Sequence, residues 1–88
     1  MTKEDFIVCM HLLNAYYLDW QFNFQDKIQV QTWYQFLSDA MDFDTLKRVI
    51  NAWTARHNTG PNSPRDLLKL KIELEIRDMV NQGEDTQC

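Results

Sequence analysis

Helix-breaking residues are concentrated in one short stretch of this chain. The segment RHNTGPNSPRDLL, residues 56–68, contains both prolines and one of the two glycines. Proline removes a backbone donor and clashes inside a helix, and glycine weakens a helix interior. On either side of this segment, apolar residues recur three and four positions apart, which is helical spacing. The pattern predicts helices on both sides of a corner at residues 56–64.

Apolar spacing and capping residues together predict four helices. The first, second and fourth are expected over residues 3–17, 26–39 and 64–81. The third is expected to begin after a cap at Asp42 or Asp44. The last helix has the start signal SPRD, with serine as N-cap, proline at the first helical position and aspartate in the first turn. The stretch LDWQFNF alternates aromatic and polar residues, but a single strand has no partner here. We therefore expect an aromatic-rich loop between the first two helices.

The length of 88 residues suits one small domain, and 44% hydrophobic residues are enough for a core. The predicted fold is all-α: a single bundle of about four helices with a long C-terminal helix, over residues 1–82, and a flexible tail at residues 83–88. No stretch approaches the roughly 20 apolar residues that span a bilayer. The N-terminus MTKEDF lacks the features of a signal peptide, so we expect a cytoplasmic protein.

No motif for catalysis or metal binding is found. Cys9 and Cys88 are too few and too far apart for a disulfide framework or a zinc site, and Cys9 falls on the apolar face of the first helix. The NTGPNSP loop lacks the Lys-Ser/Thr pair of a phosphate-binding loop, and no predicted strand precedes it. Neither His11 nor His57 has a nucleophile or carboxylate at a spacing that would indicate a catalytic pair. We therefore predict a protein without catalytic residues, metal or cofactor.

The last helix carries two apolar arcs when it is placed on a helical wheel. The broad arc consists of Leu68, Ile72, Ile76, Met79 and Val80, and the second arc of Leu67, Leu70 and Leu74. Either both arcs pack inside the bundle, or one of them is a surface for a partner or for a homodimer. The predicted partner site is the second arc with Lys71 and Arg77 alongside it. Trp20 and Phe22 of the aromatic loop are secondary candidates.

A basic stretch raises an alternative function. Residues 47–71 contain six basic residues and a single acidic one, although the whole chain has a net charge of −4. This stretch is the basis for nucleic-acid binding as the alternative function, through Lys47, Arg48, Arg56, Arg65 and Lys69. Two features oppose this alternative: the acidic total, and a connection of about ten residues, which is too long for a helix-turn-helix.

The chain resembles a known family over roughly residues 1–70. The opening MTKED, the helix pair TWYQFLSDAMDFDTLKRVINAWTARH and the following PNSPRDLL are similar to the replicative-helicase loader and inhibitor family of bacteriophages of Gram-positive bacteria. The matching positions are expected to be structural and are Trp33, Tyr34, Leu37, Trp53 and Pro64.

The resemblance implies a non-catalytic adaptor in the cytoplasm of the phage's bacterial host. Such a protein binds the hexameric replicative helicase, holds it inactive off DNA, and delivers it to an origin complex through an origin-binding protein. Family members continue into a longer C-terminal segment implicated in gripping the helicase, whereas only NQGEDTQC follows the last predicted helix here. Either the last helix takes over that contact, or the chain has a narrower role than loading.

Overall fold

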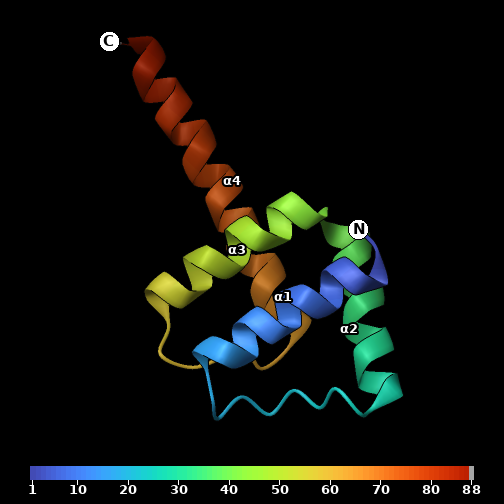
Figure 1. Cartoon of the computed structure of the whole chain (residues 1–88). Helices are drawn as coiled ribbons and strands as arrows, with labels where there is room; N and C mark the ends of the chain where they lie inside the picture. Colours follow the sequence, from blue (N-terminus) through green and yellow to red (C-terminus); the bar gives the residue numbers. More distant parts are fainter. Residues whose placement is uncertain (88) are drawn as a thin grey trace.

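A computed structural model describes the backbone of residues 1–87 and the side chains of residues 1–80. Within this part of the chain there are four helices and no strand: α1 (Lys3–Tyr16), α2 (Lys27–Ala40), α3 (Phe43–Arg56) and α4 (Pro64–Gln87) (Figure 1). The predicted all-α domain with a long C-terminal helix is confirmed. The stretch LDWQFNF is a loop, as expected.

Short polar side chains start the first three helices. In a capping box, Thr2 Oγ1 accepts a hydrogen bond from the Asp5 amide at 3.1 Å, and the Asp5 carboxylate accepts from the Thr2 amide. The Asp26 carboxylate accepts from two amides at the start of α2. At α3 the cap is Asp42, which accepts from the Thr45 amide at 2.8 Å. These contacts satisfy amides that have no partner inside the helix.

The corner before α4 follows the predicted start signal. Ser63 Oγ accepts from the Arg65 amide at 3.2 Å. The Asp66 carboxylate accepts from the amides of Asn62 and Ser63 at 3.0 and 3.3 Å. Pro64 is the first helical residue, where the missing amide hydrogen costs nothing. These bonds fix the direction in which α4 leaves the corner.

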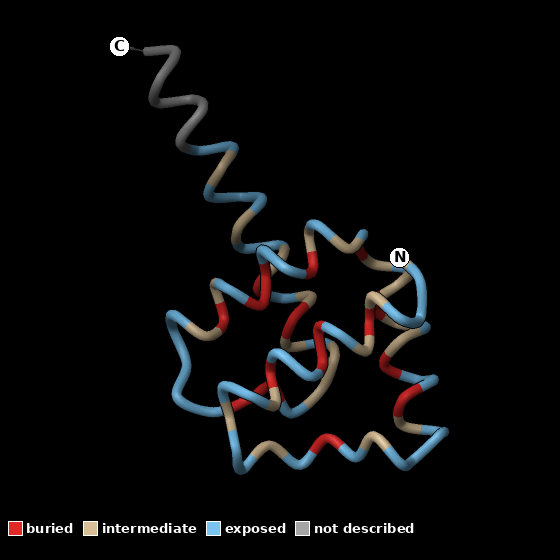
Figure 2. The backbone as a smooth tube through the Cα atoms, viewed as in Figure 1, coloured by how far each residue is buried: buried red, intermediate tan, exposed pale blue. Residues whose placement is uncertain are grey.

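The core lies between the four helices. Helix α1 packs against α3, and α4 packs against both α3 and α2. The largest fully buried side chains of these elements are Phe6, Met10, Leu13, Leu37, Leu46, Ile50 and Leu67. Figure 2 shows the buried positions on the inward side of each helix (Figure 2). Trp33 and Trp53, which carry part of the family resemblance, are also buried.

Aromatic side chains tie the two long connections together. The Tyr17 hydroxyl donates to the backbone oxygen of His57, and Trp20 Nε1 donates to that of Pro61, each at 2.8 Å. Trp53 Nε1 donates to the Thr59 oxygen, also at 2.8 Å. The loop after α1 and the connection between α3 and α4 therefore lie side by side at one end of the bundle.

Helix α4 leaves the body of the domain partway along its length. Its buried residues, Leu67 and Leu70, lie near its start, and none is buried between residues 71 and 80. The helix extends past its predicted end at Asn81. The predicted tail, residues 83–88, falls outside the residues whose side chains the structure describes.

Candidate protein-interaction surface

The structure reverses the predicted roles of the two apolar arcs of α4. Leu67 and Leu70 are 0% and 4% exposed, and Leu74 is partly buried against the same core. The expectation that these leucines contact a partner is therefore wrong for Leu67 and Leu70, because α2 and α3 already cover that side of the helix. Of the flanking residues, Lys71 is paired with Glu75 at 3.2 Å, and Arg77 is exposed.

The two aromatic candidates serve mainly to hold the loop. Phe22 is buried, which leaves little of its surface for a partner, although Trp20 and Phe22 both line the groove described below. Trp20 is half-buried, stacked on Phe22 with ring centroids 5.0 Å apart, and edge-on to Trp33 at 5.8 Å. Aromatic clusters of this kind favour burial over solvent exposure.

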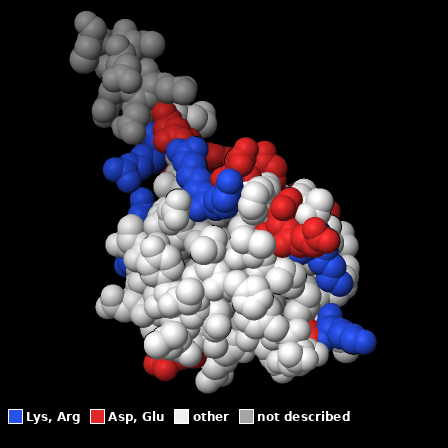
Figure 3. Space-filling model, viewed as in Figure 1, with Lys and Arg blue, Asp and Glu red and all other residues white. Residues whose placement is uncertain are grey.

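The basic stretch is interrupted by acidic neighbours. Lys47 pairs with Asp44 at 3.4 Å, Arg56 with Glu73 at 3.3 Å, and Arg48 with Asp78. Within residues 1–80 no ion pair involves Arg65 or Lys69. Figure 3 shows basic and acidic side chains next to one another where α4 leaves the body (Figure 3). The predicted nucleic-acid residues thus do not form a patch of one sign.

An exposed apolar stripe runs along the outer side of α1. We call Val8, Leu12, Tyr16 and the following Leu18 the α1 stripe; they are between 43 and 88% exposed. The first three are four residues apart and so share one helix face. No Asp, Glu, Lys or Arg occurs from Phe6 to Leu18. The domain therefore presents a charge-free apolar face on the side of α1 that is turned away from the core.

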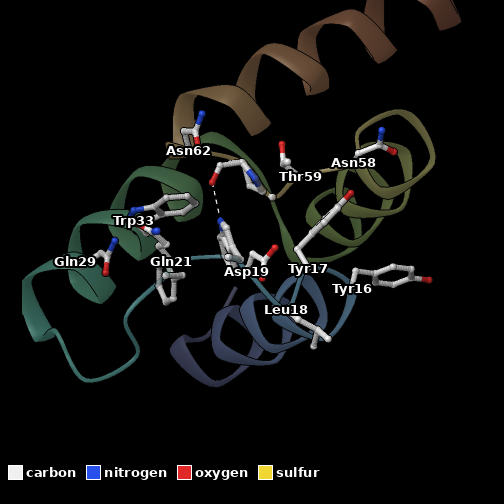
Figure 4. A pocket seen from close by; sticks show the side chains of 14 residues that line it. Tyr16, Tyr17, Leu18, Asp19, Gln21, Gln29, Trp33, Asn58, Thr59 and Asn62 are labelled. Carbon is white, nitrogen blue, oxygen red and sulfur yellow. Dashed lines mark hydrogen bonds between the residues drawn. The ribbon is translucent and has the colours of Figure 1, made fainter.

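A groove continues this surface at the end of the bundle. It has a volume of about 830 Å³ and lies between the loop after α1 and the α3–α4 connection. Tyr16 and Leu18 belong both to the α1 stripe and to the groove lining. Figure 4 shows the lining side chains, with the Trp20–Pro61 hydrogen bond as a dashed line (Figure 4). The stripe and the groove thus form one continuous surface.

The groove lining is aromatic and polar but almost uncharged. Gln21, Gln29, Asn58 and Asn62 contribute amides, which both donate and accept hydrogen bonds. Among the described residues, Asp19 is the single carboxylate in the lining, and no lysine or arginine takes part. Such a lining suits the neutral polar groups of a protein partner better than a phosphate.

The remaining reactive side chains are engaged in packing. His11 stacks on Phe24 with centroids 4.3 Å apart, and His57 stacks on Trp53 at 3.9 Å. Burial raises the pKa of the Cys9 thiol to about 11, so the thiol is neutral at physiological pH. Among the described residues, no group of three or more His, Cys, Asp and Glu is placed to hold a metal ion. None of the described helices is long and apolar enough to cross a bilayer.

The sequence contained a signal for the α1 stripe beyond the spacing that predicts the helix. The spacing that predicts this helix runs through Phe6, Met10, Leu13 and Tyr17, whereas Val8, Leu12 and Tyr16 recur every four residues on another side. A helix that is apolar on all sides is normally buried all round. In a domain this small, one side of such a helix remains exposed, and that exposure is what the sequence pattern indicates.

No protein family, curated protein or solved structure matches this chain.

Proposed function

We propose that this protein is a non-catalytic adaptor of phage DNA replication that binds the hexameric replicative helicase, or the protein that loads it. The observation that carries the binding role is the α1 stripe, four exposed apolar side chains on a charge-free face. Exposed apolar patches are typical of protein-interaction sites, and tyrosine is enriched among the residues that dominate binding energy.

The choice of helicase as partner is supported by the family resemblance. An adaptor of this kind acts by differential binding: it stabilises one state of the helicase and is released when a second partner, such as an origin-binding protein, competes. The α1 stripe and its groove supply apolar contact area and neutral hydrogen-bonding groups for such a complex. In this proposal the longer C-terminal segment of the family is not required for the first contact.

Direct nucleic-acid binding is the weaker alternative. Three of its five candidate residues, Lys47, Arg48 and Arg56, are paired with acidic side chains of the same chain. Paired cations release fewer counterions from a phosphate backbone, so they contribute less to binding.

The test is to mix the purified protein with the phage or host replicative helicase, and separately with its loader, and to measure complex formation by light scattering. We expect a complex at about micromolar concentration, which corresponds to about 8 kcal/mol of binding free energy. Leu12→Glu and Leu18→Glu should each weaken it at least about tenfold, a loss of about 1.4 kcal/mol, because each places a charge in an apolar contact. Ile28→Glu is the matched control, since Ile28 is equally apolar and 80% exposed but lies on α2.

Absence of a complex with both the helicase and the loader would contradict the proposal. A titration of labelled DNA with the protein at low and at moderate salt tests the alternative function. Binding that falls steeply with salt would favour the nucleic-acid function.

A further inference from the structure

One wall of the groove offers hydrogen-bond donors that have no acceptor within the described residues. Gln29 and Trp33 lie one turn apart on α2, so they share a helix face, and both line the groove. The Gln29 Oε1 atom accepts from the Asn23 amide at 2.9 Å, which leaves the Gln29 amino group for another partner. Trp20 and Trp53 donate their indole N–H groups to backbone oxygens, whereas no described residue accepts from that of Trp33.

The free indole N–H of Trp33 points to a ligand. Trp33 is only 6% exposed, and donors on buried side chains normally have an acceptor. No fully buried side-chain nitrogen or oxygen in the described part of the chain lacks a hydrogen-bond partner, so this N–H keeps access to solvent. Figure 4 shows Trp33 and Gln29 in the lining (Figure 4). Together they present two donors for the carbonyl oxygens of a ligand.

The lining at the end of α1 attracts positive charge. Asp19 is exposed, and no ion pair of the described residues involves it. Helix α1 ends at Tyr16 without a basic residue in its last turn, although the carbonyl end of a helix favours a cation. The Tyr16 side chain is 65% exposed, and the face of its ring also attracts cations. These features border the same groove.

The described part of the chain supplies no cation to this site. No lysine or arginine in it lines the groove. Residues 1–45, which include α1, the following loop and α2, contain two basic and seven acidic residues. A positive charge on the ligand therefore complements this surface. The charged residues that lie near the lining in the sequence each have a neighbour or an ion-pair partner of opposite sign: Asp26 with Lys27, Arg65 with Asp66, and Arg56 with Glu73.

We propose that the groove binds an extended peptide segment of a partner protein, and that this segment carries a lysine or an arginine. The basic side chain lies against Asp19, the Tyr16 ring and the carbonyl end of α1. Backbone carbonyl oxygens of the segment accept hydrogen bonds from Trp33 Nε1 and from the Gln29 amino group. The assignment of the segment to the helicase or its loader rests on the proposed function, whereas the chemistry of the site does not.

An extended peptide fits this lining better than other ligands do. Its main chain has one donor and one acceptor per residue, which match the exposed amides of Asn58 and Asn62. A phosphate would bring negative charge to Asp19 and meet no cation in the described lining. A neutral sugar would leave Asp19 and the end of α1 without a positive partner. The volume of about 830 Å³ lies within the range of ligand pockets, about 300–1,000 Å³.

The first experiment identifies the sequence that the groove selects. The immobilised full-length protein is incubated with a randomised library of short peptides, and the retained peptides are sequenced. We expect lysine or arginine to be enriched at one position. Asp19→Asn should remove this enrichment, whereas Asp39→Asn, which changes an exposed carboxylate of α2 outside the lining, should keep it. A failure to retain peptides, or equal enrichment in the wild type and Asp19→Asn, would overturn the proposal.

The second experiment measures the affinity of one selected peptide by fluorescence anisotropy. Asp19→Asn should raise the dissociation constant about two- to fivefold, the range expected for an exposed ion pair. Asp39→Asn should leave the dissociation constant unchanged, and circular dichroism should show that both variants are folded. An equal dissociation constant for the wild type and Asp19→Asn would contradict the cation site.

The indole N–H signals in a proton–nitrogen correlation spectrum locate the bound peptide. The Trp33 signal should move downfield when the selected peptide is added, because its N–H gains an acceptor. Trp53 already donates to the Thr59 oxygen and lies outside the lining, so its signal should change little. An unchanged Trp33 signal at saturating peptide would overturn the proposal. Movement of the Trp33 signal with a neutral oligosaccharide and with no peptide would overturn it as well.

Failure of this inference can be told apart from failure of the proposed function, since the helicase is absent from all three measurements. A helicase complex without peptide selection would overturn the peptide groove and leave the adaptor function. Peptide selection that depends on Asp19, without a complex with the helicase or its loader, would overturn the adaptor function and leave the groove.

Discussion

The indole ring of Trp20 lies against the backbone of Gly60. A Cβ atom at position 60 would be 2.7 Å from Trp20 Cγ and 2.8 Å from Nε1, closer than such atoms approach in proteins. The same indole donates a hydrogen bond to the neighbouring Pro61 oxygen. Glycine at this position therefore lets the loop after α1 meet the α3–α4 connection, and this meeting forms the groove.

Substitution of Gly60 should destabilise the domain. In Gly60→Ala the indole has to move, but it is packed against Phe22 and Trp33. We expect the free energy of unfolding to fall by about 1–3 kcal/mol, the usual cost of overpacking. Urea denaturation followed by tryptophan fluorescence measures it, with Asn58→Ala in the same connection as control. Equal stability of Gly60→Ala and Asn58→Ala would show that the contact is not tight.

The two arcs of α4 should respond differently to truncation. Leu67→Ala removes a fully buried side chain and should lower the free energy of unfolding by about 2–5 kcal/mol. Ile76→Ala removes a side chain that is 56% exposed and should cost less than about 1 kcal/mol. Urea denaturation of both variants measures the two losses. A larger loss for Ile76→Ala than for Leu67→Ala would contradict the assignment of the arcs.

The cap of α3 should make stability depend on pH. Hydrogen bonds from Thr45 to the Asp42 carboxylate lower the pKa of Asp42 below its ordinary value of 3.8. A carboxylate whose pKa is lower in the folded state stabilises the fold above the unfolded-state pKa, and this contribution is lost as the pH falls through the folded-state pKa. Asp42 therefore adds stability at neutral pH that disappears below about pH 4.

Asp42→Asn keeps an acceptor for the cap but removes the titration, since asparagine is also a favourable N-cap. Thermal unfolding between neutral and acid pH should show a smaller drop in melting temperature for this variant than for the wild type. Asp42→Ala should have a lower melting temperature already at neutral pH. Identical acid profiles for the wild type and Asp42→Asn would exclude the role of this carboxylate.

The Cys9 thiol should be unreactive in the native protein. It is fully buried, and burial raises its pKa to about 11, so both access and thiolate formation are suppressed. In a Cys88→Ser background, labelling by an aromatic disulfide reagent should proceed only as fast as the domain unfolds. At high concentrations of the reagent, the labelling rate should therefore no longer depend on that concentration. Rapid labelling that rises in proportion to reagent would show that the site opens without unfolding.

Local features of the fold were predictable because they depend on short stretches of sequence. The start of α4 at Pro64, with Ser63 before it and Asp66 in the first turn, depends on contacts within a few residues and was predicted from the sequence. Asp26 was predicted as the first residue of the second helix and is its N-cap, one residue earlier. The choice between Asp42 and Asp44 at α3 was left open by the sequence, because both precede the same apolar pattern. The structure selects Asp42.

The groove was not predictable, since it forms where residues about forty positions apart meet. Trp20 and Pro61 are one such pair, and Tyr17 and His57 are another. No spacing of residues in the sequence indicates that the loop after α1 and the α3–α4 connection lie side by side.

The sequence by itself determined that the chain is helical, where three of the helices begin, and that α4 has two apolar arcs. Only the tertiary structure decided that Leu67 and Leu70 face the core and that Ile72 and Ile76 face solvent. Periodicity is a property of one helix, whereas the rotation of that helix about its axis is set by what it packs against. Leu67 and Leu70 are buried where α4 packs against α2 and α3, and this packing sets the rotation of α4.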